Sequence, residues 1–193
     1  MVVAEKNLEV KHQLELEKEI HIRKAEVFYS GMKTCRIEAK EHNEVELITF
    51  DYQQNMPLPH VPCGDVFYKR QLWSYNFCIY SGKTGQSFHF MYDETIAKKS
   101  QNEVISFIYY YFKHLLKPGV KKMYIFTDNC SAQNKNNVLF QYLNTIVKFK
   151  MLDIEHIIHR YPEPGHSFLS CDRYFGLIEK VRRNTERVYL DET

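Results

Sequence analysis

The sequence predicts an α/β protein in which helices flank a mixed, five-stranded sheet and a helical extension precedes it. Three observations indicate this class. Short runs rich in aromatic and branched side chains alternate with longer segments whose apolar residues recur at helical spacing. Clusters of proline and glycine separate these segments. The length of 193 residues suits one domain with an appendage. We therefore predict a helical extension over residues 1–43 and the sheet domain over residues 44–193.

The N-terminal segment is predicted to form a helix over residues 4–29, because it is rich in Glu, Lys, Leu and His and lacks Gly and Pro. Its apolar stripe is thin, since Leu8 and Leu14 share their face with charged side chains. Such a helix is mostly solvated or docks on a partner, and a second copy of the chain in a homodimer is one such partner. Gly31 is predicted to end the helix.

Three strands are predicted next. Residues 46–51 (ELITFD) form an apolar run that ends in an aspartate, and residues 52–65 form a loop because they contain three prolines and a glycine. Residues 71–80 and 86–92 are rich in aromatic residues and are joined by a turn of five residues, SGKTG. This pattern predicts a β-hairpin.

The second half of the chain alternates between helices and strands. The first of these helices, at residues 100–116, begins with a capping box formed by Ser100 and Glu103 and is stopped by Pro118-Gly119. The later elements are a strand at 121–127, a helix at 137–150, a strand at 154–159 and a helix at 171–183. A strand and a hairpin followed by helix, strand, helix, strand, helix is the order of a ribonuclease H-like sheet, which favours that fold.

Three aspartates occupy the ends of these predicted elements. Asp51 ends the first strand, Asp128 follows the fourth and Asp172 opens the last helix. Ligands of open α/β sheets gather beyond the carboxyl ends of the strands. The first and fourth strands are neighbours in the ribonuclease H arrangement, so Asp51 and Asp128 are expected to lie close together. Two crowded carboxylates repel each other unless a cation lies between them. Two Mg²⁺ or Mn²⁺ ions suit oxygen ligands and support phosphodiester cleavage or strand transfer.

Each aspartate also has a purely structural interpretation. Asp51 could begin the following turn, Asp128 could form an Asx-turn with Asn129, and Asp172 could cap the last helix. Their joint placement at the ends of three elements favours the metal site.

Two further residues are candidates at the same site. Glu179 lies seven residues after Asp172 on the same helical face, so it could be an additional acidic ligand. An ion pair with Arg183 is its alternative. His166, in the PGHSF loop, could relay a proton to or from an attacking water. The alternative for His166 is a hydrogen-bonding role in the loop.

The amide-rich segment SAQNKNN follows Cys130 directly. Helix N-termini attract phosphate through free N–H groups, so Gln133, Asn134 and Lys135 are candidates for holding a nucleic-acid backbone near the metal ions. A simple cluster of helix-capping side chains would explain the same residues.

Composition bears on nucleic-acid binding, on the cellular compartment and on membrane association. The net charge of +2 shows no global basic field of the kind that many nucleic-acid-binding proteins carry, although a local basic strip stays compatible with it. The five cysteines include no CxxC pair, which indicates free thiols in a reducing compartment. His60 and Cys63 form one half of a zinc motif without a matching half. No apolar run reaches the length of a membrane span, and the N-terminus lacks a signal-peptide pattern. We expect a soluble, intracellular protein with no membrane partner.

Four stretches carry a resemblance to a known family. They are DYQQNMPLPHVPCGDVFYKRQLWSYNFCIY, MYDETIAKKSQNEV, TDNCSAQNKN and PGHSFLSCDRYFGLIEK. Together they resemble a family of uncharacterised, transposon-associated proteins of insects and other animals, which carry a ribonuclease H-like catalytic core of the DDE-transposase and integrase type. The resemblance implies a metal-dependent nuclease or recombinase that acts on DNA in the nucleus. It points to Asp51, Asp128 and Asp172, and it draws attention to His166 and Asn134.

The sequence departs from that family in two places, and it covers only part of such proteins. Ala132 stands where the family usually has Gly, and Tyr174 stands where it often has Asp. Family members continue past this C-terminus and carry Cys-rich segments upstream, so a flanking DNA-binding module is missing from this sequence. The chain is then expected to be an excised catalytic core or a short copy.

Three functions follow as hypotheses. The first is a DNA-processing enzyme that uses two divalent ions, with RNA as the alternative substrate. The second is a 3′–5′ exonuclease of the same fold, which Thr49 disfavours because such enzymes place a second acid in the first strand. The third is an inactive, domesticated transposase relic that serves as a scaffold for DNA or protein.

Overall fold

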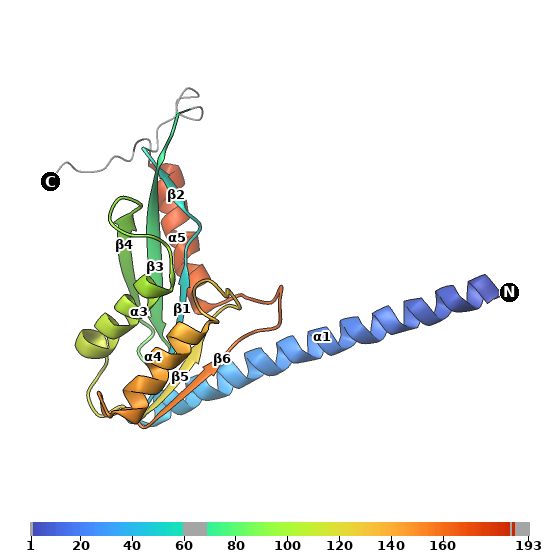
Figure 1. The fold of residues 1–193 in the computed structure, drawn as a ribbon, viewed down its shortest axis with the longest axis horizontal. Coiled ribbons are helices and arrows are strands. Elements are labelled where there is room, and N and C mark those ends of the chain that lie inside the picture. Colours follow the sequence, from blue (N-terminus) through green and yellow to red (C-terminus); the bar gives the residue numbers. More distant parts are fainter. Residues whose placement is uncertain (1, 60–68, 186, 188–193) are drawn as a thin grey trace.

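The computed structural model describes residues 2–59, 69–185 and 187, and shows an α/β architecture in which helices pack on a mixed, six-stranded sheet (Figure 1). In chain order the described elements are α1 (Val2–Glu41), β1 (Val45–Tyr52), β2 (Met56–Leu58), β3 (Leu72–Ser81), β4 (Ser87–Asp93), α3 (Gln101–Tyr110), the π-helix η1 (Tyr111–Leu115), β5 (Lys122–Phe126), α4 (Asn137–Lys148), β6 (His156–Arg160) and α5 (Ser170–Asn184). The predicted alternation of strands and helices is confirmed, with ends that differ by a few residues.

The sheet runs in the order β4, β3, β1, β5, β6, and β2 pairs with β3 beyond the end of β1. β3 is antiparallel to β1, β2 and β4, which confirms the predicted hairpin. β5 is parallel to β1, and β6 is parallel to β5. The prediction of five strands is wrong by one. The short strand β2 forms inside the expected proline-rich loop, and Pro57 is tolerated there because β2 pairs with β3 alone.

α1 is longer than predicted, since it continues through Gly31 and ends at Glu41. Gly31 marks a close approach instead of a helix end: a Cβ at this position would lie 2.9 Å from Nη1 of Arg160, which ends β6. Because Nη1 is the far end of a flexible side chain, a Cβ at Gly31 would displace the guanidinium and not the helix.

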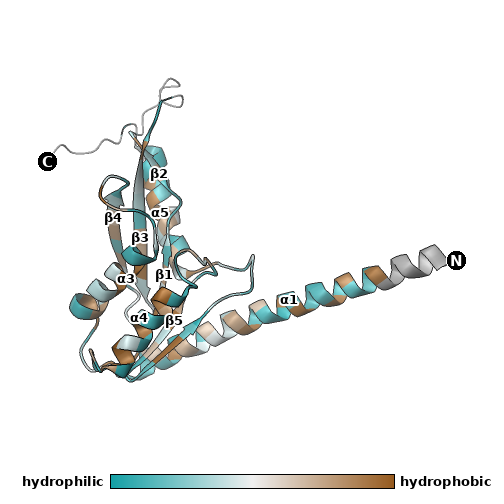
Figure 2. Cartoon of the chain, viewed as in Figure 1, coloured by the Kyte–Doolittle hydropathy of each residue, from teal (hydrophilic) through white to brown (hydrophobic). Residues whose placement is uncertain are grey.

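The two halves of α1 have different surroundings. The second half buries Ala25, Phe28, Met32, Cys35 and Ala39. The first half extends away from the sheet, and its side chains from Val10 to Glu19 are all exposed (Figure 1). Hydrophobic and hydrophilic residues are mixed along this projecting part (Figure 2). The second half thus belongs to the core that residues 44–193 were expected to form.

Alternate residues of β1 face two separate cores. Ile48 and Phe50 join the larger core, which also contains side chains of α3, η1 and α4. Leu47 points to the opposite face, where it packs with Phe28 and Met32 of α1. Since Thr49 and Asp51 lie on the same side of the strand as Leu47, their side chains face the layer formed by α1 and α5.

Local signals explain the helix ends. The capping box of α3 is confirmed, because Ser100 accepts a hydrogen bond at its side chain and Glu103 accepts one from the Ser100 backbone. α4 begins after Asn136, whose Oδ1 accepts a hydrogen bond from the Leu139 N–H at 2.9 Å. Within the described residues, none of the helices combines the length and apolar character needed to cross a membrane.

Candidate functional site

Asp51 and Asp128 lie level with each other on neighbouring strands. β1 and β5 are parallel, and Thr49 pairs with Phe126, the last residue of β5. Moving two residues further along each segment reaches Asp51 on one and Asp128 on the other. Because side chains on the same face recur every second residue, Asp51 keeps the orientation of Thr49, toward the layer of α5. The expected meeting of these two acids at the carboxyl end of the sheet is supported by this register.

Asp172 is brought to the same place by the first turn of α5. Its neighbour Cys171 is fully buried, and the Cys171 thiol donates to the backbone oxygens of Thr49 at 3.4 Å and Cys78 at 3.5 Å. Cys78 pairs directly with Asp51 between β3 and β1. The start of α5 is therefore anchored over the two strands that flank Asp51.

Asp51, Asp172 and His166 line one hollow of about 370 Å³, together with Tyr29, Gly165, Ser167 and Phe168. Asp128 does not line this hollow, but its charge raises the pKa of both Asp51 and Asp172, so it lies within electrostatic range of the two. We name this hollow, with Asp128 at its edge, the acidic hollow.

Each of the three carboxylates has one oxygen held by the protein. Asp51 Oδ1 accepts from the Tyr52 N–H at 2.7 Å, and Asp172 Oδ2 accepts from the Leu169 N–H at 2.7 Å. Asp128 Oδ1 accepts from the Cys130 N–H at 3.1 Å and from Asn134 Nδ2 at 2.6 Å.

These contacts include the structural roles that the sequence left open. Asp128 forms an Asx-turn, to Cys130, and Asp172 contributes half of a capping box. Asp51 instead lies within β1, one residue before its end. The second carboxylate oxygen of each aspartate makes no hydrogen bond to any described residue, so it is available to a ligand.

The electrostatics of the acidic hollow favour a positive ligand. Burial raises the pKa of Asp51 to about 7, and the charges of Asp128 and Asp172 add to this rise. Burial raises the pKa of Asp172 as well, again with a contribution from Asp128. These shifts express the cost of holding several negative charges together away from water, and a divalent cation would remove that cost.

The donor set suits Mg²⁺ or Mn²⁺ by its chemistry, since both prefer carboxylate oxygen. Among residues 2–59, 69–185 and 187, however, no three Asp, Glu, His or Cys side chains gather closely enough to hold one ion together. The described side chains therefore offer each ion a pair of carboxylates and not a set of three. Asp51 is the residue that such ions would share, because it lines the hollow with Asp172 and lies level with Asp128 on the neighbouring strand.

His166 lies in the acidic hollow, as expected, and its loop is fixed by α1. Tyr29 donates a hydrogen bond to the His166 backbone oxygen at 2.9 Å, and the rings of His21 and His166 lie 4.8 Å apart. Glu163 in the same loop lies 3.7 Å from His21 and 3.6 Å from Lys24. The predicted N-terminal extension thus contributes directly to the walls of the candidate site.

Lys99 is a component that the sequence analysis missed. Its ammonium donates to the Gln53 backbone oxygen at 2.9 Å and to Asn55 Oδ1 at 3.1 Å, and it lies 4.9 Å from the centre of the Tyr52 ring. Burial lowers the pKa of Lys99, while the charges of Asp51 and Asp128 raise it. The lysine is therefore the nearby positive charge that partly offsets the carboxylates. Only the fold reveals this, because Lys99 is far from the acids in the sequence.

A buried polar network behind Asp128 was also missed. Thr127 Oγ1 lies 2.8 Å from Nε2 of His159, and the Tyr161 hydroxyl lies 3.0 Å from Nδ1 of the same ring. The Tyr161 hydroxyl also lies 3.2 Å from the Asn134 backbone oxygen. Burial lowers the pKa of His159 to about 3, so this imidazole is neutral and holds the turn after β5 by hydrogen bonds.

The amide-rich segment has a different role from the expected one. Asn134 is fully buried and donates to Asp128, so the prediction that its side chain contacts a nucleic-acid backbone is wrong. Gln133, Asn134 and Lys135 also precede α4 instead of forming its first turn, and Asn136 is the cap. Lys135 is exposed, and its ammonium lies 5.3 Å from the centre of the Tyr161 ring. Gln133 is partly buried.

Glu179 is occupied elsewhere, because it accepts hydrogen bonds from Arg182 and Arg183 at 2.9 Å. These two arginines lower the pKa of Glu179 to about 2. The predicted ion pair with Arg183 is confirmed, and Glu179 does not line the acidic hollow. The half-motif of His60 and Cys63 lies outside the described residues.

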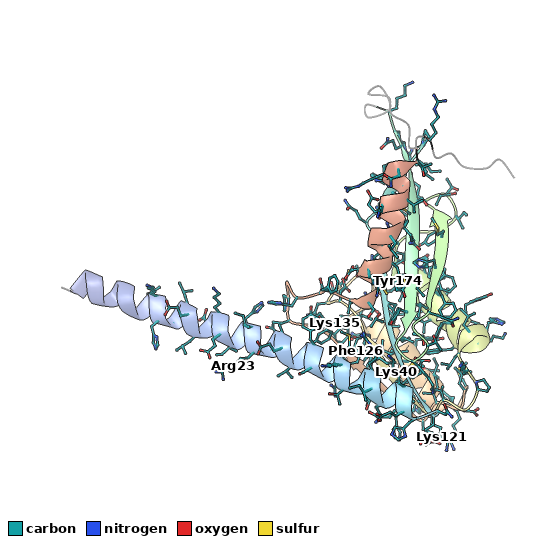
Figure 3. All side chains as sticks on the ribbon, turned by 180° about the vertical axis from the view of Figure 1, so that it is seen from behind. Arg23, Lys40, Lys121, Phe126, Lys135 and Tyr174 are labelled. Carbon is teal, nitrogen blue, oxygen red and sulfur yellow. The ribbon has the colours of Figure 1, made fainter. Side chains whose placement is uncertain are left out.

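The two departures from the expected family pattern are accommodated. Ala132 is exposed in the turn after Asp128 and does not have a positive φ, so glycine is not required there. Tyr174 donates a hydrogen bond to the Gly85 backbone oxygen at 3.0 Å and packs against Tyr80, which fixes α5 on the β3–β4 turn (Figure 3).

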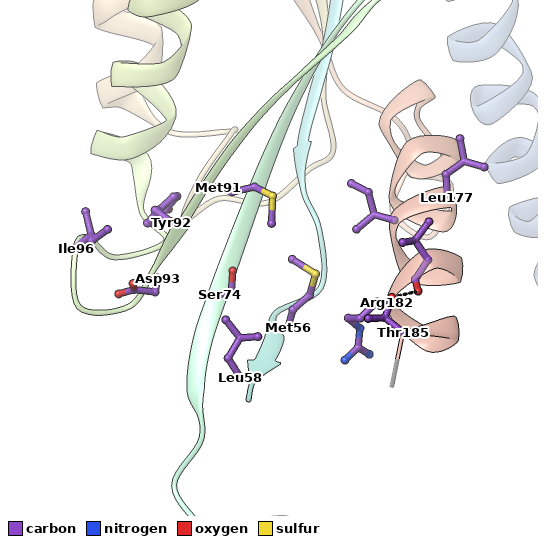
Figure 4. A pocket seen from close by; sticks show the side chains of 12 residues that line it. Met56, Leu58, Ser74, Met91, Tyr92, Asp93, Ile96, Leu177, Arg182 and Thr185 are labelled. Carbon is purple, nitrogen blue, oxygen red and sulfur yellow. Dashed lines mark hydrogen bonds between the residues drawn. The ribbon is translucent and has the colours of Figure 1, made fainter. Parts of the chain in front are cut away.

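A second hollow along α5 has the opposite character. It has a volume of about 700 Å³ and is lined mainly by apolar side chains of β2, β4 and α5, which include Met56, Leu58, Met91, Leu177 and Val181 (Figure 4). We name it the apolar groove. Among the described residues that line it, Asp93 is the only acid and accepts two hydrogen bonds from Thr95, so these residues offer no cluster of carboxylates.

Comparisons with known proteins identify a family without naming an activity. A family model described as a domain of unknown function, DUF7869, matches residues 78–191, which is more than half of the chain. The matched region includes Asp128, His166 and Asp172, whereas Asp51 and α1 precede it. No curated protein and no solved structure matches the chain. The chain therefore belongs to the family defined by the domain of unknown function DUF7869.

Proposed function

We propose that this chain is the core of a metal-dependent enzyme that cleaves or transfers phosphodiester bonds of DNA, with RNA as the alternative substrate. The observation that carries the proposal is the convergence of Asp51, Asp128 and Asp172 at the acidic hollow, where burial, with the charges of Asp128 and Asp172, raises the pKa of Asp51 to about 7. A pair of Mg²⁺ or Mn²⁺ ions would relieve this repulsion.

The strand order supports a ribonuclease H-like fold for this core. Three antiparallel strands are followed by two strands parallel to the first, in the order β4, β3, β1, β5, β6. Helices cover both faces of the sheet, as the two separate cores require. The likeness rests on topology alone, and the activity is argued from the acids.

The residues have distinct proposed roles. Asp51 and Asp128 would hold one ion between them, and Asp172 would hold a second together with Asp51. When bound, such ions polarise the phosphate and lower the pKa of an attacking water. His166 lies at the wall of the acidic hollow and would exchange a proton with the attacking or leaving oxygen. Lys99 would limit the net negative charge that an approaching phosphate meets.

Substitution of Asp128 tests the enzyme directly. Asp128→Asn keeps a hydrogen-bond acceptor at Oδ1 but removes the charge, so the fold should persist and Mn²⁺-dependent cleavage of DNA should be lost. Asp153→Asn is the matched control, because Asp153 is an exposed acid before β6. The control should cut like the parent. Cleavage by Asp128→Asn at the parent's rate would reject the assignment.

A second candidate is a scaffold that binds DNA or protein without catalysis, as an inactive relic of a transposase. It is favoured by the finding that no three ligating side chains of the described residues gather around one point. α1 would then be the docking or dimerising element, since its first half projects with exposed side chains. Calorimetric titration separates the candidates: absence of Mn²⁺ and Mg²⁺ binding with all three aspartates present would select the scaffold.

An exonuclease of the same fold receives less support. Thr49, two residues before Asp51, is fully buried against Cys171, so no second acid of β1 faces the acidic hollow at that position. Together with action on DNA we propose a nuclear location for the protein and a separate DNA-binding module as its partner.

A further inference from the structure

Phe168 has the most exposed aromatic side chain at the acidic hollow. It lines the hollow together with Asp51 and Asp172, and 69% of its surface is exposed. Isolated exposed apolar residues are common on proteins and need no explanation. This one differs because it lines the same hollow as two carboxylates and His166.

Phe168 is not explained by packing against α5 or against the hydrophobic cores. It precedes Leu169, the N-cap of α5, and a hydrophobic residue there often packs against the fourth helical residue. In α5 that residue is Arg173, which is exposed. Among the described residues, Phe168 belongs to no core cluster and to no ring pair. Helix capping and core packing therefore do not account for the phenyl ring.

The backbone on both sides of Phe168 is nevertheless held firmly. Leu169 is 1% exposed and belongs to the core between α1 and the sheet. Two residues before Phe168, the His166 backbone oxygen accepts a hydrogen bond from Tyr29, and the His166 N–H donates to Glu163 at 3.0 Å. The ring is thus presented from an anchored segment, which lowers the entropy lost when a ligand binds to it.

We propose that Phe168 stacks on an unpaired base next to the phosphate that reaches the acids, so that the substrate is single-stranded or locally melted there. This inference rests on the proposed action on nucleic acid and specifies its substrate. A base in a duplex has both faces covered by its neighbours, whereas an unpaired base offers a free face to an aromatic side chain. Divalent cations held by the neighbouring carboxylates would bind the adjoining phosphate.

Fluorescence binding measurements test this inference without requiring cleavage. The probe is a short DNA strand that contains 2-aminopurine, used alone and in a duplex, with Ca²⁺ as the divalent ion. The parent should bind the single strand more tightly than the duplex and quench its fluorescence. Phe168→Ala should weaken binding of the single strand by roughly tenfold or more, which is the usual scale for one stacked base, and should abolish the quenching.

Two further variants serve as controls for the loss of the ring. Phe168→Tyr keeps a stacking face and should restore binding and quenching. Phe149→Ala removes a ring that is 67% exposed at the end of α4, away from the acidic hollow, and should behave like the parent. Unchanged binding by Phe168→Ala, equal losses on single strand and duplex, or no preference of the parent for the single strand would each overturn the inference. Absence of cleavage by a parent that shows the predicted binding would overturn the proposed enzyme and leave the stacking role intact.

Discussion

The acidic hollow and the apolar groove lie along the same helix, α5, yet they differ in volume, in lining and in the charge of their side chains. The apolar groove is larger, at about 700 Å³ against about 370 Å³, and is lined by side chains such as Met56 and Val181. The acidic hollow is smaller and contains partly buried carboxylates with raised pKa values. Size and apolar lining, the usual guides to a ligand site, would select the groove. The raised pKa values of Asp51 and Asp172 instead indicate the acidic hollow as the functional site.

The difference arises from where each hollow lies on the sheet. The acidic hollow lies at the carboxyl ends of the parallel strands β1 and β5, where the chain leaves the sheet and polar side chains can be held by turns. The apolar groove lies beyond the end of β1, where β2 and β4 pair with β3 and present apolar side chains. The same helix can therefore serve a polar and an apolar surface. Four substitutions test whether the two hollows differ in this way.

The largest expected effect is on the pH dependence of stability. The pKa of Asp51 is about 7 in the folded chain, above its ordinary value of 3.8. Between these two values Asp51 binds more protons in the folded protein than in the unfolded protein, so this group alone should make metal-free stability fall as pH rises from about 4 to 7, by at most about 1.4 kcal/mol per pH unit. His159 acts in the opposite direction over much of the same range, because burial lowers its pKa to about 3. Asp51→Asn should therefore remove the Asp51 contribution, and in urea unfolding the stability of the variant should rise more with pH than that of the parent.

Other groups also contribute to the pH dependence of both proteins. The raised pKa values of Asp172 and Glu46 act in the same direction as that of Asp51, and the lowered pKa of His159 acts in the opposite direction. The lowered pKa of Glu179 also acts in the opposite direction, but at more acidic pH. The difference between Asp51→Asn and the parent isolates Asp51, and an identical pH dependence of the two proteins would contradict the raised pKa of Asp51.

Asn134→Ala should give the next largest effect. It removes the donor that lies 2.6 Å from Asp128 Oδ1 in a fully buried position, and hydrogen bonds to charged groups contribute about 1.5–3 kcal/mol. Denaturant unfolding at neutral pH measures the loss. Asn144→Ala is the control, because Asn144 is exposed on α4. Equal stability of the two variants would contradict the role of Asn134 as the support of Asp128.

Tyr29→Phe should have a smaller effect, which tests whether α1 belongs to the site. The substitution keeps the ring and removes the hydroxyl that donates to the His166 backbone oxygen, a contact worth about 1 kcal/mol. Faster amide exchange in the loop that contains His166 should accompany it. Tyr109→Phe, which removes an exposed hydroxyl on α3, should leave that loop unchanged. Identical amide exchange of this loop in both variants would contradict the claim that α1 holds a wall of the acidic hollow.

Val181→Ser in the apolar groove should have the smallest effect. Val181 is 66% exposed, and surface substitutions usually change stability by less than about 0.5 kcal/mol. Its pH dependence and its affinity for Mn²⁺ should match those of the parent. A loss of Mn²⁺ affinity in this variant would contradict the claim that the apolar groove takes no part in metal binding.

Particular residues show how much of the fold and of the candidate site could be predicted from the sequence. Asp51, Asp128 and Asp172 could be found because each follows or opens an element with a clear periodicity. β2 could not, because a three-residue strand with a proline is indistinguishable from a loop until β3 pairs with it. The sequence suggests a helix end at Gly31, whereas the helix continues there and Gly31 lies next to the guanidinium of Arg160 from a distant strand. Lys99 and His159 owe their positions entirely to tertiary contacts.

The most direct test is anomalous diffraction from crystals soaked in Mn²⁺. The account predicts a manganese peak between the carboxylates of Asp51 and Asp128, with Asp172 close enough to share a second ion with Asp51. Anomalous maps without a peak at the acidic hollow, at a Mn²⁺ concentration that saturates other carboxylate sites, would contradict the claim that divalent cations hold these three acids together.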